Sequence, residues 1–252
     1  MSITTPLTLS LVDMVLPDQC NHHGTLFGGA AIAMLDKLAF ILGSKAMRGP
    51  LVTAAVHHLE FHAPAQAGWL TDCVGRIHHR GRRSVTIDAR LYAENLLTGE
   101  RVRCLSCQFS MVATGHPSPV ESMVEEVFTD VRVAEIVFPG HANHRGILHG
   151  GPAMQWIAKA GFAAATRHAR QSLVMAASKE IDFLAPARVG EVVEIVARVT
   201  GSGRTSLTVT AEMDAEAPET GERRRCTTAS LVFVAIDEQG RSMPLQTIER
   251  HA

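Results

Sequence analysis

The sequence predicts an α+β protein made of two tandem copies of one domain, each with a long central helix wrapped by an antiparallel sheet. Three observations predict this fold. The chain of 252 residues repeats itself at an offset of 122 positions, which places Asn21 on Asn143 (143 − 21). Each copy has one long apolar segment, at 26–43 and at 148–165. In each copy four strand-like runs follow this segment.

The offset is too long for a solenoid, whose repeats span roughly 20–50 residues, so it indicates a duplicated domain. Matches at this offset include glycine and proline positions throughout both copies: Pro64 and Pro186, Gly68 and Gly190, Gly81-Arg82 and Gly203-Arg204, Thr98-Gly99-Glu100-Arg101 and Thr220-Gly221-Glu222-Arg223. We therefore predict one domain at 1–115 and a second at 131–252. The segment between them, 116–130, contains two prolines and four acidic residues and is predicted to be a linker.

Each copy opens with a short alternating stretch, at 7–16 and 131–138, which predicts a strand that ends before a proline. An Asn-x-x-Gly loop and a Gly-Gly pair then lead into the apolar segment. That segment is apolar nearly all round, which predicts an enclosed helix. It is not predicted to span a membrane, because it carries Asp36-Lys37 at its centre and falls short of about 20 apolar residues.

The strand-like runs of the first copy lie at 51–61, 69–79, 83–94 and 101–113. The third run alternates cleanly, with Val85, Ile87, Ala89 and Leu91 on one side and polar side chains on the other. Its counterpart alternates in the same way: Leu207, Val209, Ala211 and Met213. This pattern is typical of antiparallel strands with one solvated face, and the glycines between the runs favour hairpin turns.

Composition narrows the function. The formal net charge is −1, with 24 basic and 25 acidic residues, so no nucleic-acid partner is expected. Five cysteines without a disulfide spacing, and an N-terminus without a basic signal region, favour a reducing compartment, the cytoplasm. No metal site is expected, because the adjacent histidine pairs on predicted strands point to opposite faces.

Asp36 is the strongest candidate for chemistry. Its helical neighbours three and four residues away are all apolar: Ile32, Ala33, Ala39 and Phe40. A carboxylate on such a face is costly unless it has a partner or a task. The alternative is a solvated kink with Lys37 alongside. At the offset of 122, Asp36 corresponds to Ala158, which cannot act as a base or nucleophile.

Asn21 and Asn143 survive in both copies, just before Gly28-Gly29 and Gly150-Gly151. A glycine-led helix start exposes backbone N–H groups that stabilise a developing oxyanion. The alternatives are loop asparagines that make only local hydrogen bonds and glycines that form tight packing turns.

Together, the Asn-x-x-Gly loop with its Gly-Gly pair, Met34-Leu35-Asp36, Val52-Thr53-Ala54, Phe61-x-x-Pro64, Gly81-Arg82-x-Ser84 and the Leu-Thr-Gly-Glu-Arg turn at 97–101 resemble the hotdog-fold acyl-CoA thioesterases. The likeness is strongest to the YciA-like and brain-type tandem hydrolases, and it covers both copies. It implies a double hotdog in one chain, a trimer of double hotdogs, and hydrolysis of acyl-CoA without a metal or organic cofactor.

The resemblance also implies which copy supplies each part of the active site. The acid of one copy serves the asparagine loop of the other, so the working site comprises Asp36, Asn143, Gly150 and Gly151. A vestigial site comprises Asn21, Gly28, Gly29 and Ala158. Asp36 acts either as general base on water or as nucleophile through an anhydride. The hairpin residues Arg82, Ser84, Arg204 and Ser206 are expected to bind CoA.

Two other classes of function remain. A non-catalytic acyl-CoA-binding hotdog, acting as a sensor or regulatory module, has the same fold but no need of Asp36. A hotdog hydratase is less favoured, because the chain shows no clear Asp-x-Asn-x-x-His pattern. The loop histidines His22 and His144 recur in both copies without an assigned role.

Overall fold

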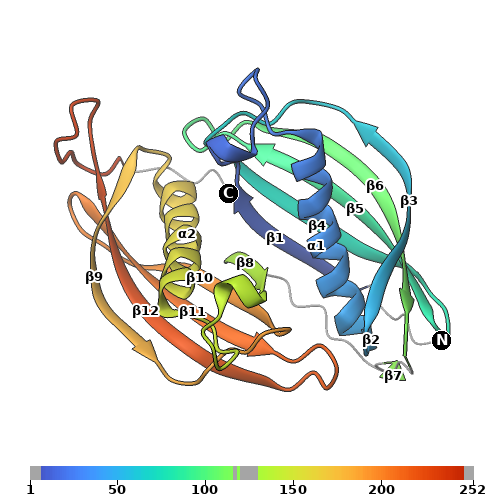
Figure 1. Cartoon of the computed structure of the whole chain (residues 1–252). Coiled ribbons are helices and arrows are strands. Elements are labelled where there is room, and N and C mark those ends of the chain that lie inside the picture. Colours follow the sequence, from blue (N-terminus) through green and yellow to red (C-terminus); the bar gives the residue numbers. More distant parts are fainter. Residues whose placement is uncertain (1–6, 116–117, 120–129, 247–252) are drawn as a thin grey trace, which may run out of the picture. The chain divides into compact units, whose positions relative to one another are not determined.

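The computed structural model describes residues 7–115, 118–119 and 130–246 (Figure 1). The first copy contains β1 (Thr8–Met14), α1 (Gly28–Ala46), β2 (Met47–Arg48), β3 (Leu51–Phe61), β4 (Leu70–Arg80), β5 (Ser84–Glu94) and β6 (Arg101–Ala113). After the short β7 (Ser118–Pro119), the second copy contains β8 (Val131–Ile136), α2 (Gly150–Ala169), β9 (Leu173–Phe183), β10 (Val192–Ser202), β11 (Ser206–Glu216) and β12 (Arg223–Ala235). A 3-10 turn precedes each asparagine loop, at Pro17–Gln19 and Pro139–His141.

Each copy folds as one five-stranded antiparallel sheet curved around one helix (Figure 1). The strand order is β1-β4-β5-β6-β3 in the first sheet and β8-β10-β11-β12-β9 in the second. Both helices bury side chains of their middle turns, such as Leu35 and Leu38 in α1 and Ile157 and Ala160 in α2. The predicted fold class, two hotdog domains in tandem, is confirmed.

Local hydrogen bonds explain where α1 differs from the predicted 26–43. The backbone N–H of Leu26 donates to the carbonyl of Ala65 at 2.8 Å, which ties this residue to a loop, so the helix begins at Gly28. At the other end the helix continues past Gly43 to Ala46. Gly43 does not end the helix. It is a packing residue, since a methyl group there would lie 3.1 Å from Leu51 Cδ1.

By its internal contacts the chain forms two compact units. One comprises Met1–Glu94, Arg101–Thr129 and Glu216–Arg223, and the other comprises Asn95–Glu100, Asp130–Ala215 and Arg224–Ala252. Residues 116–117 and 120–129 of the predicted linker lie outside the described part of the chain. Within that part, no helix is both long enough and apolar enough to cross a membrane.

Each sheet has an exposed apolar edge strand. In β3, an edge of the first sheet, four large apolar side chains are exposed: Val52, Val56, Leu59 and Phe61. In β9, an edge of the second, the exposed apolar side chains include Val174, Met175 and Phe183. Exposed apolar edge strands favour association with another sheet.

Candidate active site

The two asparagine loops share one backbone turn. The N–H of Gly24 donates to the carbonyl of Asn21 at 3.0 Å, and the N–H of Gly146 donates to that of Asn143 at 2.9 Å. Gly24 and Gly146 adopt φ of +74° and +68°, a left-handed conformation that only glycine adopts without strain. The glycine of each Asn-x-x-Gly run is therefore required by the turn, which fixes the asparagine next to the helix start.

The two asparagine side chains differ in what they leave available. Asn143 Oδ1 accepts hydrogen bonds from the backbone N–H groups of Arg145 at 2.9 Å and Ile147 at 3.2 Å. These bonds fix its orientation, and among the described residues its Nδ2 has no acceptor. In the first copy Asn21 Nδ2 donates to Thr25 Oγ1 at 3.0 Å. Because Ile147 replaces Thr25, the second copy presents a free amide donor and the first does not.

The helix starts differ in access. The first backbone N–H groups of a helix have no partner within the helix, and no side chain caps α1 or α2. A methyl group at Gly29 would lie 2.6 Å from Phe27 Cε1, whereas a methyl group at Gly151 meets nothing within 4 Å. His149 stands where the first copy has Phe27. Packing therefore does not explain Gly151.

Asp36 lies half-buried near the middle of α1 and accepts a hydrogen bond from Thr53 of β3, with 2.6 Å between Thr53 Oγ1 and Asp36 Oδ1. The predicted carboxylate therefore has a dedicated partner on the sheet. In the second copy both members are missing, because Ala158 replaces the aspartate and Met175 replaces the threonine. Loss of the acid and of its partner together indicates that the two residues act as a unit.

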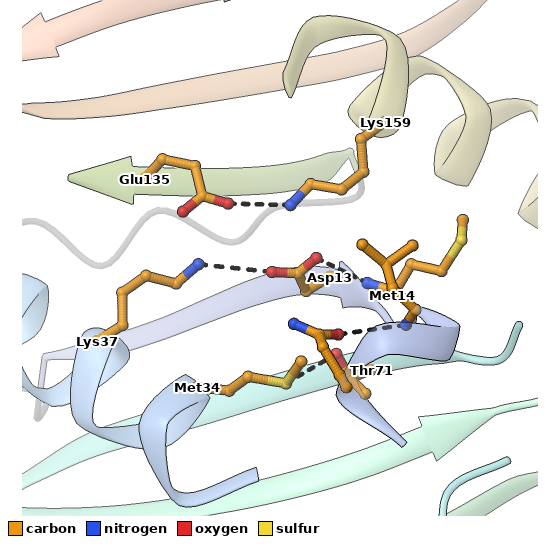
Figure 2. Close-up of polar contacts among 9 residues, drawn as sticks. Asp13, Met14, Met34, Lys37, Thr71, Glu135 and Lys159 are labelled. Atoms are coloured by element: carbon orange, nitrogen blue, oxygen red, sulfur yellow. Dashed lines mark hydrogen bonds and ion pairs between the residues drawn. The ribbon is translucent and has the colours of Figure 1, made fainter. Parts of the chain in front are cut away.

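The lysine beside Asp36 is engaged elsewhere. Lys37 Nζ lies 3.5 Å from Asp13 Oδ2 of β1, as Figure 2 shows. The second copy keeps this helix-to-strand pair, with Lys159 Nζ 2.9 Å from Glu135 Oε1. Both pairs are partly buried and fix the register of helix against strand. The lysine at this position thus serves the fold in both copies, while the neighbouring position carries an acid only in the first.

The cysteine thiol near Asp36 does not compete with it as nucleophile. Cys107 of β6 is the nearest candidate, and burial, reinforced by the charge of Asp36, raises the pKa of its thiol to about 11. A thiol of that pKa is protonated at neutral pH, and the thiolate is the reactive form. The Cys107 thiol is therefore a poor nucleophile beside the Asp36 carboxylate.

The predicted CoA-binding residues occupy two equivalent hairpin turns: Arg82 with Ser84 between β4 and β5, and Arg204 with Ser206 between β10 and β11. Arg82 and Arg204 are exposed. Within the first copy, the hairpin lies at the C-terminal end of α1, where Arg80 Nη1 donates to the carbonyl of Ala46 at 3.5 Å. That end is about 28 Å from the asparagine loop, at 1.5 Å for each helical residue, so the structure does not bring these two groups together within the copy.

A cavity adjoins each asparagine loop. The cavity of the first copy has a volume of about 300 Å³ and is lined by residues that include Asn21, Thr25, Phe61, His62, Cys104 and Leu105. That of the second copy measures about 290 Å³ and is lined by residues that include Ile147, Leu148, Phe183, Leu184, Met213 and Thr227. The two cavities use equivalent positions, and Leu184 of the second stands where the first has His62.

Thr53 is absent from the predicted site. The sequence contained a signal for it, because Val-Thr-Ala at 52–54 corresponds to Val-Met-Ala at 174–176. The two copies thus differ at the threonine as they differ at Asp36 and Ala158. His22 and His144 are exposed in their loops. Among the described residues, no group of three His, Cys, Asp or Glu side chains is arranged to hold a metal ion.

Comparison with known proteins gives a consistent family. Residues 23–100 and 145–222 each match the thioesterase superfamily. A crystal structure of an acyl-CoA hydrolase from Agrobacterium tumefaciens is 35% identical, with a TM-score of 0.85 over 96% of this chain and 99% of that one. Acyl-coenzyme A thioesterase 11 of Mus musculus is 21% identical over 96% of this chain, which spans 50% of that protein's length. The acyl-CoA thioester hydrolase YkhA of Bacillus subtilis is 34% identical over 44% of this chain and 65% of its own length.

Proposed function

The chain belongs to the thioesterase superfamily, and we propose that it hydrolyses acyl-CoA to a free acid and CoA at one working site assembled from unequal halves. The first copy supplies Asp36 and Thr53, and the second supplies Asn143 and the amides of Gly150 and Gly151. Likeness along nearly its whole length to an acyl-CoA hydrolase supports the reaction. The observation that carries the proposal is the Asp36–Thr53 pair, which a pure binding module does not need.

The chemistry follows from the groups available. Thr53 donates to Asp36 Oδ1, which holds the carboxylate in one orientation and leaves Oδ2 to accept a proton from water. The hydroxide equivalent adds to the thioester carbonyl. The carbonyl oxygen gains negative charge, which the Asn143 Nδ2 donor and the N–H groups at the start of α2 stabilise. Collapse of the tetrahedral intermediate breaks the carbon–sulfur bond and releases the CoA thiolate, which takes up a proton.

Attack by the Asp36 carboxylate itself, through a mixed anhydride, uses the same groups. A single turnover in H₂¹⁸O detects the anhydride route when water attacks the Asp36 carbon of the anhydride. General-base catalysis places the label in the released acid and leaves Asp36 unlabelled. Hydrolysis of an anhydride at the Asp36 carbon leaves ¹⁸O in the Asp36 peptide, which mass spectrometry detects.

The decisive experiment is thiol release from a panel of acyl-CoAs by matched variants. Asp36→Asn should lower kcat by about 10²–10⁴ through loss of the base. Asn143→Ala should lower it by about 10²–10³ through loss of an oxyanion donor. Asn21→Ala, its partner at the offset of 122, should leave turnover largely intact. Substantial activity in Asp36→Ala, or equal effects of the two asparagine variants, would sink the proposal.

A different result of the same assay would support the alternative function, an acyl-CoA-binding module without catalysis. Thermal stabilisation of the wild-type protein by acyl-CoA, without release of thiol from any member of the panel, would assign the chain to acyl-CoA-binding sensors. The vestigial counterpart of the site comprises Asn21, Gly28, Gly29 and Ala158, whether the chain is an enzyme or a binding module.

The remaining parts of the proposal concern binding and assembly. Arg82, Ser84, Arg204 and Ser206 bind the CoA phosphates and pantetheine, since exposed guanidinium groups suit a polyanion. Arginine-to-alanine changes there should raise KM and leave kcat unchanged. The reaction uses water and the chain's own groups, without metal or organic cofactor.

The chain assembles as a trimer of double hotdogs in the cytoplasm. The exposed apolar edges of β3 and β9 support association, and the five free cysteines suit a reducing compartment. Light scattering should give three times the 27.2 kDa of one chain. A monomer at micromolar concentration would contradict this assembly.

A further inference from the structure

The outer face of the first sheet carries a polar pocket that the proposed reaction does not use. It has a volume of about 280 Å³ and is lined by residues of β3, β5 and β6. Two exposed arginines line it, Arg90 of β5 and Arg103 of β6. The neighbours of Arg90 on β5, Ala89 and Leu91, are buried, so Arg90 points away from the core. Within the described part of the chain, neither arginine makes an ion pair or a side-chain hydrogen bond.

The second copy shows the same positions with their charges balanced. Arg225 is equivalent to Arg103 at the offset of 122, and its Nη1 lies 3.0 Å from Glu212 Oε1. Arg225 also pairs with Asp214. Where the second copy has Glu212 the first has Arg90, and where it has Asp214 the first has a tyrosine. Side chains at these positions therefore reach one another, and in the first copy they bring two cations together without either acid.

Two carboxylates also line the pocket, but both have other partners. Asp88 Oδ1 accepts a hydrogen bond from Gln108 Nε2 at 2.8 Å, and Arg76 Nη2 lies 3.7 Å from Asp88 Oδ2. Glu60 Oε2 lies 3.9 Å from a ring nitrogen of His62. The two unpaired arginines are therefore the groups of the pocket that remain available to an anion.

The backbone beside the pocket is strained in the first copy alone. His58 of β3 lines the pocket and has a φ of +50°, in the left-handed region that residues with a side chain rarely adopt. It lies at a bulge, where the pairing of β3 with β6 shifts between His57 and Glu60. The equivalent residue of the second copy, Glu180, does not have a positive φ. Strain of this kind concentrates at functional sites, and here it coincides with the unpaired arginines.

We propose that Arg90 and Arg103 together bind a phosphate group of a small-molecule ligand in this pocket. The planar guanidinium group presents a fork of N–H donors that matches phosphate oxygens. A phosphate group supplies to Arg103 the negative charge that Glu212 and Asp214 supply to Arg225 in the second copy. The inference does not depend on the proposed thioesterase function, because binding here requires no part of the proposed active site.

The test is calorimetric titration with inorganic pyrophosphate in a buffer without phosphate or sulfate. The wild-type protein should show a saturable site that persists in Arg82→Ala. Arg90→Glu, which recreates the ion pair of the second copy, and Arg103→Gln should each raise the Kd of this site at least about tenfold, because each removes a charged donor. Arg225→Gln, the matched change in the second copy, should leave the Kd unchanged. Thermal denaturation checks that each variant is folded.

The absence of saturable binding by the wild-type protein, or the same Kd in Arg90→Glu, would overturn the inference. Loss of binding in Arg82→Ala alone would also overturn it, because that result assigns the anion to the hairpin. Titrations with CoA and with ADP distinguish the source of the phosphate group. A Kd for CoA that rises in Arg90→Glu indicates a phosphate of the substrate, whereas a rise for ADP alone indicates a separate nucleotide. Thiol release tests the proposed function independently, and its failure leaves the binding result unaffected.

Discussion

Gly151→Ala and Gly29→Ala together separate a glycine kept for function from a glycine kept for packing. The two residues are equivalent at the offset of 122 and both lie in the first turn of a helix. A methyl group at Gly151 has no heavy atom within 4 Å, whereas one at Gly29 would lie 2.6 Å from Phe27 Cε1. The same substitution therefore meets open space in one copy and an aromatic ring in the other.

The expected changes in stability follow from these distances. Replacing glycine by alanine in a helix without strain raises the free energy of unfolding by about 0.4–1 kcal/mol, so Gly151→Ala should be slightly more stable than wild type. Gly29→Ala should gain less, because the Phe27 ring must turn away; this ring is 60% exposed and has room to do so. Both variants should fold.

Activity should change in the opposite order. Under the proposed function, the methyl group of Gly151→Ala stands beside a backbone N–H that stabilises the thioester oxygen, and loss of one such donor costs about 10²–10³ in kcat. Gly29→Ala should retain wild-type kcat. Urea denaturation and thiol release on the same preparations give both quantities. A fully active Gly151→Ala, or equal loss in both variants, would refute the assignment of the α2 start as the oxyanion site.

Three further predictions concern single contacts. In Ile147→Thr the new hydroxyl should accept a hydrogen bond from the amide of Asn143, as Thr25 accepts one from Asn21. This should lower kcat by about tenfold, which corresponds to one hydrogen bond of about 1.4 kcal/mol. Thr25→Ile, the matched control, should leave kcat unchanged. Arg132→Met should lower the free energy of unfolding by about 3–5 kcal/mol, because it breaks a buried ion pair with Glu194 whose side chains are 6% and 2% exposed. Urea denaturation should show most of the loss recovered in Arg132→Met/Glu194→Leu. Asp88 is the third case: burial raises the pKa of its carboxyl, but hydrogen bonds from Gln108 and His78 outweigh burial and hold the pKa below its usual value. The stabilising effect of the Asp88 carboxylate is therefore present above the pKa of this group in the unfolded chain and is lost as the pH falls through its pKa in the folded protein. The difference in stability between wild type and Asp88→Asn should close below about pH 4. A difference that persists at lower pH in a pH series would contradict this.

Most of the fold is predictable because it repeats and alternates. The bounds of β3 and β6 agree with the predicted 51–61 and 101–113, since turn residues mark their ends. Helix ends are less predictable from local sequence. Leu26 is apolar and helix-compatible, yet a hydrogen bond to Ala65, distant in sequence, keeps it out of α1. The short β2–β7 pair also depends on segments far apart in the chain.

The candidate site was predictable where it depends on residue identity and not where it depends on contacts. Asp36 and Ala158 differ in the sequence itself. The role of Thr53 depends on which residue of β3 faces Asp36 across the helix–sheet interface, which needs the three-dimensional register. The shielding of Gly29 by Phe27 and the free amide of Asn143 likewise depend on side-chain placement. The working grouping of Asp36 with Asn143, Gly150 and Gly151 stays a prediction.

The pattern of losses argues for divided labour rather than decay of one copy. Decay would remove functional features from a single copy. Instead the second copy lacks the acid and its threonine, while in the first the Phe27 ring lies beside Gly29 and Thr25 accepts a hydrogen bond from the amide of Asn21. Each copy therefore keeps a feature that the other lacks. Under the proposed function such complementary differences are expected, because two formerly equivalent sites come to depend on one acid half and one oxyanion half, and mutations in the unused halves then carry no cost to turnover.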